Sequence, residues 1–240
     1  MSMEQKRVYE QVGVAMTSRS YAEYEKMFIL QTENLIGKRV LDVAGGASSF
    51  TVEARQLGIF SEAVDPLYEK SAEEIAEHGL QEIELVAAKM EKLVDVYDWT
   101  YYGSVDNHKA GRVKSLKQFV NDFSSKDAAS RYHAACLPSL PFAEESFDLV
   151  LISHFLFLYE DQFDYSFHRA AVKELLRVCK PGGEVRIYPL LNFRQAEYSK
   201  LSELINELTN EGYLVQKREA SLPFLPNSHQ YLCIIKNPSA

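Results

Sequence analysis

The fold is decided by residues 39–46, Arg-Val-Leu-Asp-Val-Ala-Gly-Gly. The β-branched and apolar residues at the start of this stretch predict a short strand, and the two glycines predict a tight turn directly after it. Ser48 or Ser49 can then cap a helix, in which apolar residues recur at helical spacing from Phe50 onward. The segment therefore predicts a strand, a turn and a helix, which is the repeating unit of an α/β sheet.

The same alternation continues to the end of the chain. Two short helices are expected within residues 1–36, one of them opened by a capping box at Ser20 and Glu23. Further strands are expected at residues 60–64, 131–135, 147–152, 184–188, 213–219 and 230–235, and helices at 164–178 and 194–210. This order predicts an α/β fold with a doubly wound, mostly parallel, seven-stranded sheet. The short loop between the last two strands allows an antiparallel C-terminal strand.

Residues 81–130 interrupt this alternation. Apolar residues from Ile83 to Tyr97 and from Val113 to Phe123 recur at helical spacing, so we interpret the segment as a helical insert before strand four. A helical region that opens at Ser71 precedes it, with Gly79 as a candidate break. Long insertions at this edge of a sheet often contain functional residues, so we expect the insert to form a lid.

Composition and charge narrow the class of protein. A chain of 240 residues suits one domain, residues 1–240, with residues 1–36 as an N-terminal helical cap. The formal charge of −8 disfavours DNA and anionic lipids as partners. We interpret the basic residues between His108 and Lys126 as the solvated face of a helix, in preference to a lid face that recognises an anion.

Targeting and redox signals point to the cytoplasm. No apolar window is long enough for a transmembrane helix, and the first residues lack the apolar stretch of a secretion signal. The three cysteines, Cys136, Cys179 and Cys233, are scattered and odd in number. We therefore expect no disulfide framework, no metal site, no membrane partner and a reducing, cytoplasmic compartment.

Chemistry is expected beyond the carboxyl ends of the strands, where open α/β sheets bind their ligands. Gly45 and Gly46 follow the first strand and let the backbone approach a ligand closely. Asp65 follows the second strand, and a carboxylate there can accept hydrogen bonds from both hydroxyl groups of a ribose. These residues predict a nucleoside-binding site at this edge of the sheet.

Four segments in order make the chain resemble the class I S-adenosylmethionine-dependent methyltransferases. They are residues 40–46, residues 64–65, residues 140–150 with Leu-Pro-Phe followed by Ser-Phe-Asp-Leu-Val, and residues 176–183, Leu-Arg-Val-Cys-Lys-Pro-Gly-Gly. The resemblance covers residues 40–187 without the insert. It implies S-adenosylmethionine as cofactor and methyl transfer by in-line displacement, which depends mainly on alignment and desolvation.

The resemblance also implies which residues hold the cofactor. The methionine moiety would lie on Asp42, Ala44, Gly45 and Gly46, the ribose on Asp65 and Pro66, the adenine near Ala135, Cys136 and Leu137, and the methyl group above Ser153, His154 and Phe155. Tyr24 or Arg19 would close over the cofactor carboxylate.

Two positions depart from the family pattern. Ala44 and Ser48 stand where the family has its outer glycines, and Cys136 stands where many members have an aspartate that accepts from the adenine amino group. Adenine contact would then rely on backbone groups and apolar packing.

Candidate catalytic residues follow the fourth and fifth strands. His154 is the best candidate for a general base, because imidazole titrates near neutral pH, although a histidine in such an apolar run is more often a hydrogen-bonded core residue. Tyr159 and Tyr188 could touch the acceptor.

Alternative functions remain open. Residues 45–50, Gly-Gly-Ala-Ser-Ser-Phe, fail the G-x-G-x-x-G pattern of dinucleotide-dependent oxidoreductases. Residues 153–156, Ser-His-Phe-Leu, replace the Asn-Pro-Pro-Tyr motif of enzymes that methylate base amino groups. We therefore expect a small-molecule acceptor, with a protein or RNA substrate or a non-catalytic cofactor-binding module as alternatives. The acceptor atom and the oligomeric state are left open.

Overall fold

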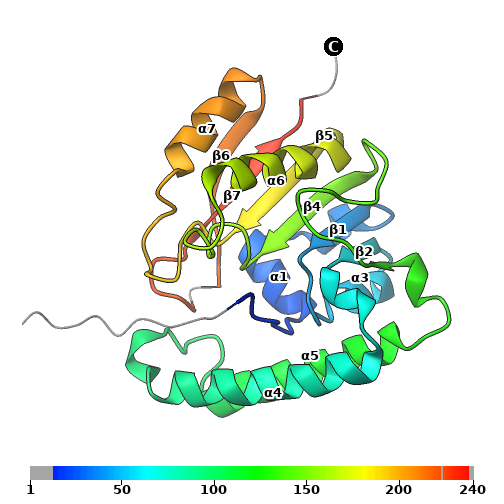
Figure 1. Cartoon of the computed structure of the whole chain (residues 1–240), viewed down its shortest axis with the longest axis vertical. Coiled ribbons are helices and arrows are strands. Elements are labelled where there is room, and N and C mark those ends of the chain that lie inside the picture. The colour runs from blue at the N-terminus through cyan, green and yellow to red at the C-terminus, as the bar shows by residue number, and fades with distance from the viewer. Residues whose placement is uncertain (1–12, 223, 238–240) are drawn as a thin grey trace, which may run out of the picture.

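A seven-stranded sheet forms the centre of the computed structural model, which describes residues 13–222 and 224–237 (Figure 1). The strand order is β3-β2-β1-β4-β5-β7-β6. The strands are β1 (Arg39–Val43), β2 (Phe60–Val64), β3 (Tyr132–His133), β4 (Phe147–Ser153), β5 (Cys179–Tyr188), β6 (Leu214–Glu219) and β7 (Gln230–Ile235). Strands β3, β2, β1, β4 and β5 pair in parallel, and β7 runs antiparallel to both of its neighbours. The predicted sheet is confirmed, including its antiparallel C-terminal strand.

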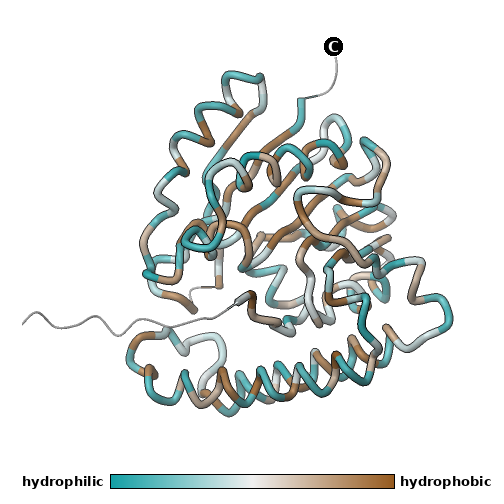
Figure 2. Tube along the Cα trace, viewed as in Figure 1, coloured by the Kyte–Doolittle hydropathy of each residue, from teal (hydrophilic) through white to brown (hydrophobic). Residues whose placement is uncertain are grey.

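Helices cover both faces of this sheet. They are α1 (Tyr21–Phe28), α2 (Thr32–Leu35), α3 (Phe50–Gln56), α4 (Ala72–Glu91), α5 (Val105–Phe123), α6 (Tyr165–Val178) and α7 (Leu201–Asn210). Helices α6 and α7 pack on one face, against side chains such as Leu41 and Val150, and α1 and α3 pack on the other, against Val40 and Leu149. Adjacent strand residues are therefore buried on opposite faces, as parallel strands between two helix layers require. Figure 2 shows the hydrophobic colour concentrated along the central strands.

The insert is a pair of long helices, α4 and α5, which lie side by side below the sheet (Figure 1). It precedes β3, which leads on to β4, and its first helix begins at Ala72, earlier than the predicted start at residue 81. The expected break at Gly79 is wrong, because α4 runs through it without interruption. A Cβ atom at Gly79 would lie 2.8 Å from the side chain of Leu116 in α5. Glycine at this position permits the close approach of the two helices.

The other corrections concern the ends of elements. The predicted helix at residues 194–210 is wrong over its first turns, because α7 begins at Leu201. Asn192 explains this difference: its side-chain oxygen accepts hydrogen bonds from the backbone N–H groups of Arg194 and Ala196, at 2.9 and 3.1 Å. Such local bonds compete with helix formation. Strand β3 is shorter than predicted, β5 begins earlier, and α4 ends at Glu91 rather than continuing to Tyr97.

Some expectations fall partly outside the described residues. Residues 1–12 of the predicted N-terminal helical cap are among them, whereas α1 and α2 confirm its second half. None of the helices within residues 13–222 and 224–237 is long and apolar enough to cross a membrane.

Candidate functional site

Two adjoining cavities lie at the carboxyl ends of the central strands. The larger one, of about 510 Å³, is called the large cavity. It brings together almost every residue that was predicted to contact the cofactor: Arg19, Tyr24, Ala44, Gly45, Gly46, Asp65, Pro66, Ala135, Cys136, Leu137, Ser153, His154 and Phe155. These residues come from five segments of the chain, and they meet because the carboxyl ends of parallel strands lie at one edge of the sheet.

Asp42 differs from the rest of this set, because it lies beneath the cavity floor. Its side chain is only 1% exposed, and the hydroxyl group of Tyr24 donates to both carboxyl oxygens at 3.0 Å. A Cβ atom on Gly45 would lie 2.8 Å from Asp42 Oδ2, so only glycine fits between this carboxyl group and the cavity. Burial raises the pKa of Asp42 to about 8, although the hydrogen bond from Tyr24 opposes the shift. The group therefore retains a proton at neutral pH unless a cation lies near it.

Asp65 fixes the turn after β1 and keeps acceptor capacity for a ligand. Its Oδ2 atom accepts from the backbone N–H of Gly46 at 3.0 Å, and its Oδ1 atom accepts from that of Leu67 at 2.8 Å. Burial raises the pKa of Asp65, while these two N–H groups lower it. A carboxylate has about four acceptor sites, so about two remain free on the half-buried side chain.

Arg19 is a cation with no ion-pair partner within residues 13–222 and 224–237. No hydrogen bond or ion pair from its guanidinium group is present among the described residues, and the side chain borders both cavities. Burial and the nearby Arg112 lower its pKa, with Glu23 opposing. Tyr24, by contrast, is engaged with Asp42. Of the two residues predicted to close over a carboxylate, Arg19 is therefore the one with free donors.

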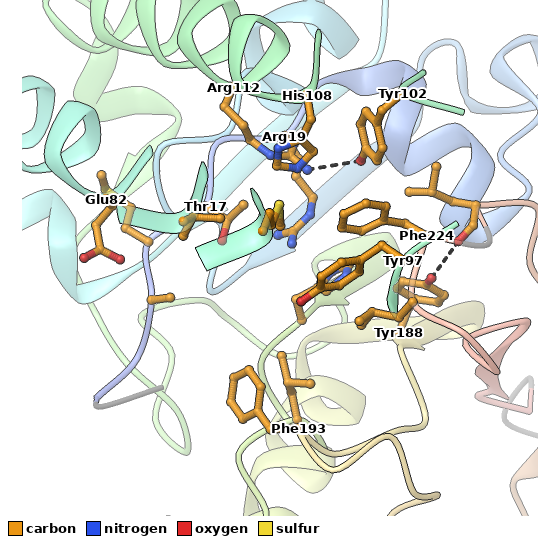
Figure 3. Close-up of a pocket in the computed structure, with 18 of the residues that line it drawn as sticks. Thr17, Arg19, Glu82, Tyr97, Tyr102, His108, Arg112, Tyr188, Phe193 and Phe224 are labelled. Carbon is orange, nitrogen blue, oxygen red and sulfur yellow. Dashed lines mark hydrogen bonds between the residues drawn. The ribbon is translucent and has the colours of Figure 1, made fainter. Parts of the chain in front are cut away.

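The second cavity, called the small cavity (Figure 3), has a volume of about 120 Å³ and shares part of its lining with the first. His154 and Arg19 border both. The three predicted catalytic residues all line the small cavity, but in different ways. The Tyr188 hydroxyl donates to the carbonyl of Leu222 at 3.0 Å, which leaves its ring as the surface that faces the cavity. The Tyr159 hydroxyl accepts from a backbone N–H, that of Ala15, at 2.8 Å.

His154 lies at the junction of the cavities in an uncommon conformation. Its φ angle is +53°, a left-handed conformation that costs a non-glycine residue on the order of 1–3 kcal/mol. Its Nδ1 atom is buried and has no hydrogen-bond partner within the described part of the chain. Burial, together with Arg19 and Arg112, holds the pKa of His154 well below its usual value. The imidazole is therefore neutral, and its buried Nδ1 atom is left without a partner in this part of the chain.

A buried charge network was missed by the sequence analysis. Arg112, from α5, forms an ion pair of 2.6 Å with Glu23 of α1, and its side chain is only 7% exposed. Tyr102 donates to the same Glu23 oxygen at 2.6 Å. A signal was present, because Arg112 lies four residues before Leu116 and seven before Phe119, on the buried stripe of the helix. The neighbouring Lys114 is exposed and fits the predicted solvated face.

No group of three or more metal-ligating side chains that could hold a metal ion occurs among residues 13–222 and 224–237. The charged side chains described above at the site are those of Arg19, Asp42, Asp65 and the Glu23–Arg112 pair.

Comparisons with known proteins found one family model and one relative of similar length. A family model described as a methyltransferase domain matches residues 110–187. An uncharacterized protein of Methanocaldococcus jannaschii is 29% identical over 220 residues, which cover 91% of this chain and 95% of that protein.

Solved structures of low sequence identity resemble the chain. One is the Burkholderia thailandensis 1,6-didemethyltoxoflavin-N1-methyltransferase with bound 1,6-didemethyltoxoflavin and S-adenosylhomocysteine (14% identity, TM-score 0.47, 91% of this chain and 79% of that chain). Another is the magnesium protoporphyrin IX methyltransferase of Synechocystis with bound S-adenosylmethionine (12% identity, TM-score 0.46, 84% of this chain and 70% of that chain).

Proposed function

We propose that the chain is a class I, S-adenosylmethionine-dependent methyltransferase that transfers the cofactor's methyl group to a small-molecule acceptor, which the methyltransferase-domain match over residues 110–187 supports. One observation carries this proposal: the large cavity, bordered by Gly45, Gly46 and Asp65, adjoins a small cavity, and His154 lines both.

The large cavity suits the cofactor in size and in polar groups. A cavity needs a volume of about 10–15 Å³ to hold one water molecule. The 510 Å³ of the large cavity therefore correspond to roughly 34–51 waters, which is enough for an amino acid joined to a nucleoside. Asp65 has free acceptor sites for ribose hydroxyls, and Arg19 has free donors for a carboxylate. Asp42, whose pKa is raised, lies under Gly45, where an ammonium group would restore its charge. The unpaired polar groups of the cavity thus match those of the cofactor.

The chain's own residues bind the cofactor, align the acceptor and exclude water from the site. The bound cofactor supplies a methyl group activated by its sulfonium. We assign Arg19 to the cofactor carboxylate and Asp65 to the ribose. His154 Nδ1 lies at the junction and would accept a hydrogen bond from an acceptor N–H or O–H group, which orients the attacking atom. The buried walls keep water away from the reacting groups.

The small cavity supports a small-molecule acceptor. Its 120 Å³ correspond to roughly 8–12 waters, so an acceptor of about a dozen non-hydrogen atoms fits and a folded macromolecule does not. The insert contributes Ile83, Val86 and Met90 to one wall, and the β6–β7 loop contributes Leu225. We propose that the insert, predicted over residues 81–130, acts as a lid over this site, within a single domain capped by the N-terminal helices.

We further propose a cytoplasmic enzyme without a DNA or membrane partner. The free thiols of all three cysteines and the net charge of −8 support this part of the proposal.

Methyl transfer can be tested without knowing the acceptor. The protein is incubated with methyl-labelled S-adenosylmethionine and a cell extract, which is then separated into small-molecule, protein and RNA fractions. We expect label in the small-molecule fraction, because the small cavity admits only small acceptors. Label confined to protein or RNA would contradict the proposed acceptor class. Cofactor binding without transfer to any fraction would favour a non-catalytic binding module.

Cys136 gives a second test, of the cofactor site itself. It is exposed at the edge of the large cavity, whereas Cys179 and Cys233 are buried and burial raises the pKa of each thiol to about 12. N-ethylmaleimide should therefore label one thiol. S-adenosylhomocysteine at ten times its Kd should slow this labelling about tenfold, because only the unbound fraction reacts.

The control is Cys136→Ser, which should take up no label in the native state. Labelling of Cys136 at an unchanged rate under saturating S-adenosylhomocysteine would place the cofactor elsewhere.

A further inference from the structure

The small cavity is walled largely by side-chain rings. They come from the insert, from the end of β5, from the loops after β4 and β5, and from the β6–β7 loop: Tyr97, Tyr102, His108, Tyr159, Tyr188, Phe193 and Phe224. Phe224 stacks against both Tyr97 and His108, at centroid distances of 4.8 and 5.3 Å and at 13° to each ring. The Tyr102 ring meets it edge-on at 4.9 Å. Walls of this kind offer flat apolar faces, which favour flat aromatic ligands.

The charges around this cavity are already paired or lie at its side. Arg112 is paired with Glu23, and Glu82 is half-buried and lies on the side away from Tyr97 (Figure 3). Burial and the nearby Arg112 lower the pKa of His108 to about 3, so its ring is neutral. Arg19 enters the cavity beside His108 and Arg112 (Figure 3).

An anion buried in this cavity would have no counter-ion once the cofactor is bound, and a cation against the ring walls would lie away from Glu82. This step rests on the proposed function, in which the cofactor carboxylate pairs with Arg19. A buried charge without a partner is strongly unfavourable, whereas an uncharged ring meets no such cost.

We propose that the small cavity binds a flat, uncharged aromatic or heteroaromatic acceptor, with its face against the ring walls and its nucleophilic edge toward His154. The acceptor's lone pair forms the new bond to the methyl carbon, and the bond from that carbon to sulfur breaks with its electron pair left on sulfur. The N–H or O–H proton of the acceptor passes to His154 Nδ1 and then to solvent. The positive charge of the sulfonium thus leaves as a proton, and both products are uncharged.

Three matched probes test the charge preference. Benzamide, benzoate and benzamidinium share one flat ring and nearly one size, and they differ in charge. Each is titrated by ligand-observed NMR into protein saturated with S-adenosylhomocysteine. We expect benzamide to bind at least about tenfold more tightly than either ion, because only the ions lose their hydration without gaining a partner. Tightest binding of benzoate would identify an anion subsite at Arg19, and tightest binding of benzamidinium would identify a cation site. Either result, or the absence of binding by all three, overturns the proposal.

Two neighbouring substitutions on α4 locate the binding. Val86 lines the small cavity, so Val86→Trp should fill it and abolish benzamide binding. Leu85→Trp is the matched control, because Leu85 is 49% exposed and lines neither cavity. Equal loss in both variants, or no loss in Val86→Trp, contradicts the assigned position. S-adenosylhomocysteine titrated into each variant separates the two proposals, since failure to bind it would overturn the proposed function itself.

Discussion

Replacing Arg112 by methionine is expected to lower the free energy of unfolding by about 3–5 kcal/mol. The substitution leaves the Glu23 carboxylate buried, 4% exposed, without its counter-ion. It also removes the link that joins α5 of the insert to α1. Urea unfolding at neutral pH measures the change. Lys114→Met, on the exposed face of the same helix, is the control and should change stability by no more than about 0.5 kcal/mol.

The charge pair also predicts an acid dependence. Although burial alone would raise it, Arg112 and the N–H of Ser20 lower the pKa of Glu23 to about 2. A carboxyl group with a lowered pKa in the folded state stabilises that state above its unfolded pKa, and this stabilisation is lost as the pH falls toward 2. The double substitution Glu23→Gln with Arg112→Met should recover most of the lost stability, because it leaves no unpaired charge. A double variant as unstable as Arg112→Met would show that packing, and not charge, carries the effect.

Asp65→Ala is expected to weaken the binding of S-adenosylhomocysteine at least about 100-fold. Each hydrogen bond to a charged group contributes about 1.5–3 kcal/mol, and two ribose hydroxyls are assigned to this carboxylate. The backbone N–H groups of Gly46 and Leu67 also lose their acceptor, which loosens the turn after β1. Calorimetric titration measures the affinity.

Asp65→Asn is the matched control for this substitution. Its amide keeps one acceptor oxygen and nearly the same shape, so we expect a loss smaller than that of Asp65→Ala. Circular dichroism should show an intact fold for both variants, because the side chain is half-buried at the sheet edge and outside the apolar core. Unchanged affinity in Asp65→Ala would refute the assignment of the ribose to this residue.

Local patterns in the sequence were sufficient to predict the sheet, and the resemblance to a known family added most of the residues around the large cavity. Each strand has its own apolar run, and the right-handed connections of an α/β fold place the strand ends at one edge. Gly45, Asp65 and His154 therefore meet as predicted, although they are far apart in the sequence. Where the predictions fail, a side chain overrides the local pattern. The Asn192 side chain accepts hydrogen bonds that take the place of the first turns of the predicted helix at residues 194–210. The Leu116 side chain lies so close to position 79 that only glycine fits there within α4.

The sequence alone thus determined the succession of strands and helices, the turn after β1 and the edge of the sheet at which the predicted site residues meet, because these depend on periodicity and on short segments. Only the tertiary structure decided that Arg112 pairs with Glu23, that Arg19 forms no ion pair within the part of the chain that the structure describes, and that rings from four segments line the small cavity. Glu23 and Arg112 are 89 residues apart, and no local pattern relates them. Such pairings arise when packed helices bring distant side chains together in an interior that excludes water, where an unpaired charge is costly.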